Sequence, residues 1–232
     1  MNRPLVVVTG AAGGLGRIVA RMFQEAGARL ILVDISEAAL VAAFGAARDD
    51  QLLVAVDLTN AAAVEDALKP VFDQHGAATV LCNIAGGFSM GPAVHETPDQ
   101  LWRQLLDLNV ATVINACRAV VPAMLKARNG KIINVAAAGA SSGAAQKGAY
   151  CAAKSAVARL TESMALELRG QGINVNAVAP SIIDTPANRA DMPDADFSEW
   201  VSPQDLGKVI GFLASHEAGA VHGAVIPVVG LS

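Results

Sequence analysis

A glycine-rich turn near the amino terminus is the feature that most constrains the fold. Residues 9–16 read Thr-Gly-Ala-Ala-Gly-Gly-Leu-Gly and join the apolar run Leu5–Val8 to a helical pattern over Gly16–Ala26. Glycines at such a junction let the backbone turn sharply and approach a pyrophosphate, which the free N–H groups of the helix N-terminus can bind. A purely structural turn uses the same residues, but the position between strand and helix favours a dinucleotide site. Its candidate contacts are Gly10, Gly14, Leu15 and Gly16.

Short apolar runs recur at regular intervals along the chain and alternate with stretches of helical period. Each run is short, β-branched and bounded by Gly, Asn, Asp or Pro, which is typical of a buried strand. The alternation predicts an α/β fold: a Rossmann-type doubly wound parallel sheet of about seven strands with helices on both faces. We expect a single nucleotide-binding domain over residues 1–232, because no linker divides the chain. The expected strands are Leu5–Val8, Leu30–Val33, Leu52–Val56, Val80–Cys82, Ile132–Val135, Ile173–Val178 and Val225–Val229.

The composition argues against several classes of protein. Aromatic residues make up only 4% of the chain and hydrophobic residues 53%, so we expect an aliphatic core. The net charge of −4 argues against a nucleic-acid partner, and no uninterrupted apolar run reaches the roughly 18 residues that span a bilayer. Without a signal-peptide pattern, a cytoplasmic protein is expected. The three cysteines and four histidines lack metal-ligand spacing, so we expect buried free thiols and no metal site.

Asp34 indicates which dinucleotide this site prefers. It ends the second expected strand, 24 residues after Gly10. A carboxylate at this place can accept hydrogen bonds from both hydroxyls of an adenosine ribose, and it would repel a 2′-phosphate. The next residue is Ile35, and no Arg or Lys stands beside it to attract that phosphate. We therefore expect NAD(H) rather than NADP(H), although a solvated strand-end carboxylate is the alternative interpretation of Asp34.

Several motifs occur in a recognisable order along the chain. They are Thr-Gly-x3-Gly-x-Gly at residues 9–16, Asp57-Leu58-Thr59, Asn83-Ile84-Ala85-Gly86, Asn109 within Leu-Asp-Leu-Asn-Val, and Tyr150-x3-Lys154. Together they resemble the short-chain dehydrogenase/reductase family over nearly the whole chain. The resemblance implies that Asp57 and Leu58 border the adenine and that Ile183 and Thr185 bracket the nicotinamide carboxamide. It also implies that the turn at 83–86 stabilises the central sheet beside the cofactor, with Asn83, Ala85 and Gly86 as candidate residues.

Tyr150 and Lys154 are the candidate catalytic pair. At positions i and i+4 they share one face of a helix. A tyrosine hydroxyl has an ordinary pKa of about 10, and a neighbouring ammonium would lower it towards the range useful for acid–base chemistry. The resemblance implies that Lys154 also holds the nicotinamide ribose, and that Asn109 supports a water that passes protons to Lys154. A bare Tyr-x3-Lys pair is common on helices, so the upstream dinucleotide site is what favours catalysis.

One position departs from the family pattern. Family members normally carry a serine 13 residues before the tyrosine, and counting back from Tyr150 reaches Ala137. Ser141 and Ser142 follow four and five residues later, and we do not expect them to substitute. Loss of one oxyanion donor typically costs on the order of 10²–10³ in rate. Three explanations stay open: a weakened dehydrogenase, a substrate that does not need this donor, or a binding protein without catalysis.

The segment Pro180–Pro203 is the least regular part of the chain and carries four prolines. It follows an expected strand, where ligands bind in α/β sheets, so we expect a substrate lid rather than an ordinary surface excursion. Its sequence, and the aromatic Phe88 after the paired glycines, resemble dihydropteridine reductases, a family branch that also lacks the serine. A quinonoid substrate would spread its charge over a conjugated ring. Phe88 and Trp200 can equally be packing residues. Arg189 and Asp191 can be solvated charges rather than substrate ligands.

The sequence thus predicts an NAD(H)-dependent oxidoreductase of a small molecule, with dihydropteridine-reductase-like activity as the most specific hypothesis. The alternatives are an alcohol or 3-oxoacyl-type carbonyl dehydrogenase with a weakened oxyanion site, or a non-catalytic NAD-binding sensor or scaffold. We expect a homodimer or homotetramer, since the resemblance implies pairing through the two long helical segments, Asp99–Leu125 and Ser155–Leu168. Their Ala-rich faces can instead simply cover the sheet.

Overall fold

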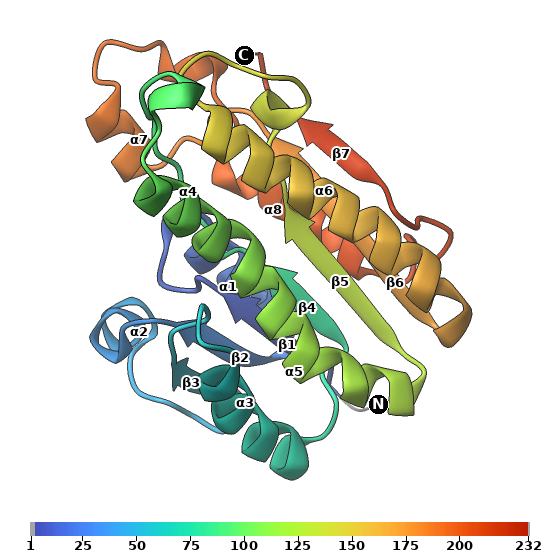
Figure 1. Ribbon diagram of the computed structural model, residues 1–232. Helices are drawn as coiled ribbons and strands as arrows, with labels where there is room; N and C mark the ends of the chain where they lie inside the picture. The colour runs from blue at the N-terminus through green and yellow to red at the C-terminus, as the bar shows by residue number, and fades with distance from the viewer. Residues whose placement is uncertain (1–2, 232) are drawn as a thin grey trace.

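The computed structural model describes residues 3–231 and is built around one seven-stranded parallel sheet (Figure 1). The strand order is β3-β2-β1-β4-β5-β6-β7, and every neighbouring pair is parallel. The fold is therefore the Rossmann-type α/β architecture that the sequence predicts. The strands are β1 (Leu5–Thr9), β2 (Arg29–Asp34), β3 (Gln51–Ala55), β4 (Val80–Asn83), β5 (Gly130–Val135), β6 (Ile173–Pro180) and β7 (Val225–Val228).

Helices cover both faces of this sheet (Figure 1). In Figure 1, α3, α4, α5 and α6 lie in front of the strands, while α1 and α8 lie behind them. The helices are α1 (Gly14–Glu25), α2 (Glu37–Phe44), α3 (Ala61–His75), α4 (Asp99–Leu106), α5 (Thr112–Ala127), α6 (Gly148–Leu168), α7 (Pro186–Asp191) and α8 (Pro203–Ala214). Four short 3-10 turns and one π-helical turn complete the regular structure of the described residues.

The strands supply alternate residues to two separate aliphatic cores, as strands buried on both faces must. In β1, Leu5 and Val7 join the core beneath α3, α5 and α6, whereas Val6 and Val8 join the core beneath α1, α2 and α8. Each core contains few aromatic rings, which confirms the prediction from composition. The three cysteines are buried free thiols, as expected.

The order of the strands reverses between β1 and β4, which are neighbours although two strands separate them in the chain. In open parallel sheets, ligands bind outside the carboxyl ends of the strands at such a switch point. Thr9 ends β1 and Asn83 ends β4, and the two residues are paired in the register of the sheet. The fold therefore brings the glycine-rich turn and the turn at 83–86 to the same edge.

The predicted boundaries need three corrections. Helix α1 begins at Gly14 rather than Gly16, and α6 begins at Gly148 rather than Ser155, so Tyr150 and Lys154 both lie in its first two turns. The expected continuous helix Asp99–Leu125 is interrupted by a π-helical turn over Asp107–Ala111. Such wide turns inside helices are frequent at functional sites, and this one contains the buried Asn109.

The helical stretch Asp99–Ala127 is long and apolar enough to cross a membrane, with a mean hydropathy of 1.5 over its best window. Polar residues such as Asn109, Asn115 and Arg118 interrupt the stretch, so it contains no uninterrupted apolar run of spanning length. Its apolar side chains Val113, Val120 and Met124 are buried in the core against the sheet. It is therefore a helix of the hydrophobic core.

Candidate functional site

The glycine-rich turn packs tightly against the turn that follows β4. Gly10 has a φ of +61°, and a Cβ on it would lie 2.8 Å from the Cα of Ala85. A Cβ on Gly16 would overlap the carbonyl oxygen of Gly10. Gly13 precedes α1 without a side-chain cap, so the first N–H groups of this helix keep no side-chain acceptor. These are the features that a phosphate-binding turn needs.

The hydroxyl of Thr9 joins the two turns directly. Thr9 is buried at the end of β1, and its Oγ1 accepts hydrogen bonds from the backbone N–H groups of Ile84 and Ala85, at 3.0 and 3.1 Å. The same hydroxyl lies 3.4 Å from the carbonyl oxygen of Cys82, to which it donates. A single buried side chain therefore positions the turn at 83–86 against the glycine-rich turn.

Asp34 lies at the end of β2 with its carboxylate turned towards the glycine-rich turn. Its Oδ2 accepts a hydrogen bond from the N–H of Ala12, and its Oδ1 accepts one from the N–H of Ile35, both at 2.9 Å. Each carboxylate oxygen has a second lone pair, so both retain capacity for further donors. The half-buried carboxylate thus presents acceptors and negative charge beside the glycine-rich turn.

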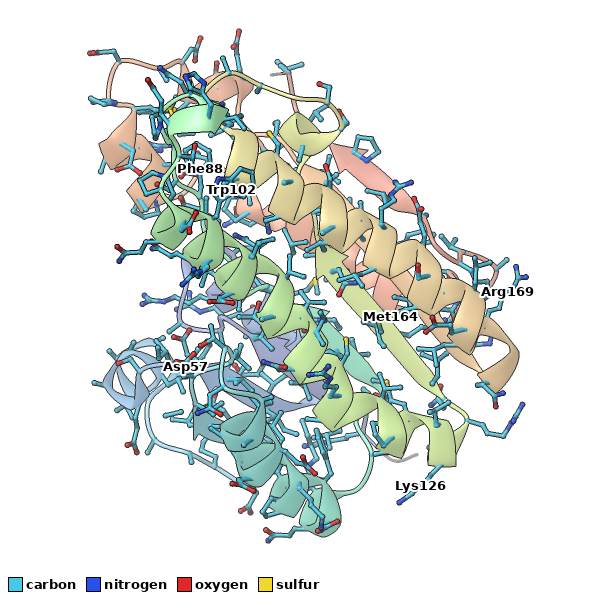
Figure 2. The ribbon with its side chains drawn as sticks, viewed as in Figure 1. Asp57, Phe88, Trp102, Lys126, Met164 and Arg169 are labelled. Atoms are coloured by element: carbon cyan, nitrogen blue, oxygen red, sulfur yellow. The ribbon has the colours of Figure 1, made fainter. Side chains whose placement is uncertain are left out.

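Asp57 and Leu58, the residues expected around the adenine, make different contacts from each other. The Oδ1 of Asp57 accepts hydrogen bonds from the N–H and hydroxyl of Thr59, so this carboxylate shapes its own turn and remains exposed (Figure 2). Leu58 is buried, and its carbonyl oxygen accepts a hydrogen bond from Nδ2 of Asn115 at 2.9 Å. The sequence motifs did not single out Asn115, because its role depends on α5 packing beside this turn.

Asn83 belongs to a buried chain of amides that crosses the sheet. Its Nδ2 donates to Oδ1 of Asn134 at 2.8 Å, and Nδ2 of Asn134 donates to the hydroxyl of Thr161 at 2.9 Å. These bonds tie β4, β5 and α6 together. The Oδ1 of Asn83 has no hydrogen-bond partner among the described residues. The role implied for Asn83, stabilisation of the central sheet, agrees with this placement.

Asn109 and Lys154 converge on Gly86. A Cβ on Gly86 would lie 2.8 Å from Oδ1 of Asn109 and 3.2 Å from Nζ of Lys154. The side chain of Asn109 forms a reciprocal pair with the backbone of Gly87: it accepts from the N–H at 3.1 Å and donates to the carbonyl oxygen at 3.0 Å. A Cβ at position 86 would therefore force the ends of these two side chains to move away from the turn.

Lys154 is nearly fully buried and points to the carboxyl end of β5. Its exposed fraction is 6%, and its Nζ donates a hydrogen bond to the carbonyl oxygen of Val135 at 2.8 Å. Burial disfavours the charged form and lowers the pKa of Lys154 to about 8. No carboxylate forms a salt bridge with it among residues 3–231.

Tyr150 lies one helical turn before Lys154 and packs against Phe88. The two ring centroids are 4.9 Å apart in an edge-to-face arrangement. Burial raises the pKa of Tyr150 to about 12. The expectation that Lys154 lowers this pKa is wrong for the described structure: burial has the larger effect, and the neighbouring thiol of Cys151 adds to it. The phenol is therefore protonated near neutral pH.

Ala137 lies in extended backbone between β5 and the short turn Ala138–Ala140. It offers a methyl group where a hydroxyl is expected. Ser141 does not replace it, because its hydroxyl is exposed and donates to the carbonyl oxygen of Ala138 at 2.8 Å. The turn is held to α6 by the hydroxyl of Ser155, which donates to the carbonyl oxygen of Ala140 at 2.7 Å.

The segment 181–202 is more ordered than its sequence suggests. It forms α7 and a 3-10 turn over Phe197–Glu199, and Ile183 pairs with Val201 as an isolated parallel bridge. Thr185 caps α7 through its hydroxyl, which accepts from the N–H of Asn188. A Cβ on Gly14 would lie 3.0 Å from Cγ2 of Thr185, so this segment reaches the start of α1.

The charged and aromatic residues of this segment contact one another. Arg189 forms a two-pronged ion pair with Asp184, which lowers the pKa of that carboxyl. The guanidinium also lies 4.6 Å from the ring centroid of Phe197, and Phe197 packs on Trp200. With an exposed fraction of 8%, Trp200 is a packing residue. Asp191 is exposed, as the solvated interpretation predicts.

Comparison with known proteins agrees with this geometry. The family model described as short chain dehydrogenase matches residues 4–196. The meso-2,3-butanediol dehydrogenase of Serratia marcescens is 34% identical over 99% of this chain and 94% of its own length. The 3-oxoacyl-(acyl-carrier-protein) reductase FabG of Vibrio cholerae serotype O1 is 30% identical over 97% of this chain and 96% of its own length. A solved oxidoreductase of the short chain dehydrogenase/reductase family from Burkholderia thailandensis superposes with a TM-score of 0.88, at 30% identity and covering 99% and 92% of the two chains.

Proposed function

Since the chain belongs to the short-chain dehydrogenase/reductase family and is an oxidoreductase acting on small molecules, we propose that it is an NAD(H)-dependent dehydrogenase in which Tyr150 is the proton donor and acceptor. The observation that carries the proposal is the convergence of Asn109 and Lys154 on Gly86. This glycine lies two residues before Phe88, which contacts Tyr150. A protein that only binds dinucleotides does not need this arrangement of proton-carrying groups. The proposal therefore favours an enzyme over a sensor or scaffold.

The residues at the carboxyl ends of β1 and β2 fit a nicotinamide dinucleotide. The backbone around Gly10 and Gly14 and the uncapped start of α1 would hold the pyrophosphate. Asp34 would accept the hydrogen bonds of the adenosine ribose, and its negative charge favours NAD(H) over NADP(H). Ile183 and Thr185 would meet the nicotinamide carboxamide, since Thr185 lies beside Gly14. When bound, this cofactor supplies or accepts the hydride.

The side chains of the chain itself supply the proton transfer. A phenol with a pKa of about 12 is fully protonated near pH 7, so Tyr150 can donate a proton to a carbonyl oxygen that is being reduced. Lys154 lies one turn further along the same face of α6, where its ammonium would hold the nicotinamide ribose. Asn109 holds the loop that carries Gly86 and Gly87, and thereby positions Lys154.

Ala137 favours a second candidate substrate. Without a hydroxyl at this position, Tyr150 is the single side-chain donor that the proposal assigns to the reacting oxygen. A quinonoid dihydropterin, whose charge is delocalised during reduction, relies less on a second donor than an isolated alkoxide does. The proposal therefore includes dihydropteridine-reductase-like activity beside alcohol and carbonyl chemistry. NADH oxidation with a quinonoid dihydropterin, measured against simple ketones, decides between these substrates.

The proposed homodimer or homotetramer rests on apolar residues that face outwards. Leu106 on α4, Leu125 on α5 and Leu166 on α6 are exposed to more than a third. Pairing of these helices between two copies would bury them. Sedimentation of the purified protein measures the assembly.

Substitution of Tyr150 by Phe tests the proposed mechanism. The Tyr150→Phe variant keeps the ring that packs on Phe88 but lacks the proton, so NADH binding is expected to persist while turnover falls by about 10²–10⁴. NADH affinity is read by fluorescence titration and turnover by absorbance. Undiminished turnover would rule out the role of Tyr150, and loss of NADH binding would show that the ring serves the cofactor site instead.

A further inference from the structure

Lys147 and Tyr150 both contact the ring of Phe88. Lys147 is the residue before α6, and it is half-buried. Its Nζ lies 5.6 Å from the centroid of the Phe88 ring, whose edge-to-face partner is Tyr150 at 4.9 Å. A cation and the proposed proton donor therefore share one aromatic neighbour.

The loop that carries Phe88 is fixed to the loop that carries Lys147. The N–H of Gly91 donates to the carbonyl oxygen of Gln146 at 2.8 Å. A Cβ on Gly148 would lie 2.6 Å from Cγ2 of Val94, so the two loops also touch at their far ends. Phe88 itself remains 56% exposed despite its contact with Tyr150. The ring is thus held in place while one side of it stays open to a ligand.

No carboxylate pairs with Lys147 among the described residues. Lys147 is the one charged residue between Lys131 and Lys154, and residues 84–94 contain none. Glu96, further along the Phe88 loop, is exposed, and its Oε1 lies 3.8 Å from Nε2 of His95. Among residues 3–231, no carboxylate lies within salt-bridge distance of the Nζ of Lys147. In the lid segment, Asp184 is paired with Arg189, and Asp196 accepts hydrogen bonds from Ser198. The first turn of α6 also lacks an acidic residue, so the N-terminal end of this helix adds to the positive field.

The contact with Phe88 alone does not account for Lys147. A cation–π contact at an exposed site contributes about 0.5–1 kcal/mol and uses none of the three N–H donors of the ammonium. Those donors have no acceptor in the described structure beyond the solvent. An unpaired ammonium that shares the Phe88 ring with the proposed proton donor is suited to bind an anionic group of the molecule on which the donor acts.

Building on the proposed function, we propose that Lys147 binds a carboxylate of the substrate, and that the enzyme acts on small oxo acids or hydroxy acids. The carboxylate would contact Lys147, the aliphatic part would lie over Phe88, and the carbonyl or hydroxyl group would meet Tyr150. In the reducing direction, Tyr150 would give its proton to the carbonyl oxygen, and the bound cofactor would supply the hydride to the carbonyl carbon. The carboxylate stays unchanged.

A pair of probes that differ only in charge tests this proposal. Acetoacetate carries the carboxylate, and methyl acetoacetate has the same 3-oxo group as a neutral ester. Lys147→Met should raise the KM for acetoacetate at least about tenfold, which corresponds to about 1.4 kcal/mol. The KM for the ester should change less than about twofold. Lys147→Arg should restore part of the preference. Lys126→Met is the matched control, since Lys126 lies at the opposite end of the molecule from Phe88 (Figure 2). An equal change for both probes would overturn the proposal.

Binding without turnover separates this proposal from the proposed catalytic role. Acetoacetate is titrated calorimetrically into the NADH-bound Tyr150→Phe variant, with and without Lys147→Met. Binding that weakens at least about tenfold with the second substitution supports the role of Lys147, whether or not the wild-type protein reduces either probe. Binding that is absent from the Tyr150→Phe variant, or that is equally strong in both variants, overturns it.

Discussion

Lys154 and Val135 are joined by a buried hydrogen bond of 2.8 Å from the ammonium to the backbone oxygen at the end of β5. This bond directs the lysine towards Gly86 rather than towards solvent. Burial lowers the pKa of Lys154 from 10.5 to about 8, so an ammonium at this position is unfavourable for folding. The protein keeps a charge in its core that stability alone would remove.

The first prediction is that Lys154→Met inactivates the protein and stabilises it. Each pKa unit corresponds to about 1.4 kcal/mol, so at pH 7 the variant should be more stable by on the order of 2 kcal/mol after loss of the hydrogen bond to Val135. Between pH 8 and 10.5 the unfolded lysine binds more protons than the folded one, so wild-type stability gains from rising pH. The advantage of the variant should shrink across this window in urea unfolding. A variant less stable than the wild type at pH 7 would contradict the prediction.

The second prediction uses the fact that Tyr150 is the one tyrosine of the chain. Its phenolate absorbance therefore reports a single group. Phe88→Ala exposes the Tyr150 ring and should lower its pKa from about 12 towards 10, because burial is the main cause of the raised value. Phe212→Ala, which removes an exposed side chain of α8, is the control and should leave the titration unchanged. Circular dichroism at each pH excludes unfolding. An unchanged pKa in Phe88→Ala would mean that groups other than Phe88 bury the Tyr150 ring.

The third prediction concerns cofactor preference. Asp34→Asn removes the negative charge but keeps an acceptor for the N–H of Ala12. The ratio of kcat/KM for NADH over NADPH should fall at least about tenfold, because the 2′-phosphate no longer meets a carboxylate. Asp66→Asn, an exposed carboxylate on α3, should leave the ratio unchanged. If Asp34→Asn also leaves it unchanged, Asp34 does not select the cofactor.

The fourth prediction is that Ala137→Ser increases carbonyl reduction. A hydroxyl at the extended backbone after β5 adds a second donor for the reacting oxygen, and a rise of about tenfold or more in kcat corresponds to at least about 1.4 kcal/mol. Turnover of a simple ketone by both proteins measures it. Ala138→Ser, one residue on, serves as the positional control. Equal turnover by wild type and Ala137→Ser would mean that this site does not lack a donor.

The fold was largely predictable because local pattern and tertiary structure agree. All seven apolar runs overlap the observed strands, since β-branched residues bounded by turn residues form buried strands whichever helices cover them. The interruption at Asp107–Ala111 was not predictable. Its wide turn depends on the side chain of Asn109 pairing with Gly87, a partner 22 residues away.

The candidate site was predictable in its residues and less so in their energetics. The motifs named Asn109 and Lys154, and their approach to Gly86 follows from the topology of the sheet. The sequence did not predict that the pKa of Tyr150 is raised, because the burial that raises this pKa depends on loops such as the one that carries Phe88. Lys147 went unnoticed for the same reason: its neighbour is distant in sequence.

The hydroxyl of Thr9 makes the two turns at the edge of the sheet behave as one rigid part. It binds the N–H groups of Ile84 and Ala85, while Gly10 fits against the same backbone. The hydroxyl of Thr9 does not bind the segment 181–202 or the loop at 88–98, which lie outside this rigid part. Residues 186–202 should therefore be exchangeable between relatives with a change in substrate selectivity alone, provided that Ile183 and Thr185, which the proposal places at the nicotinamide, are kept.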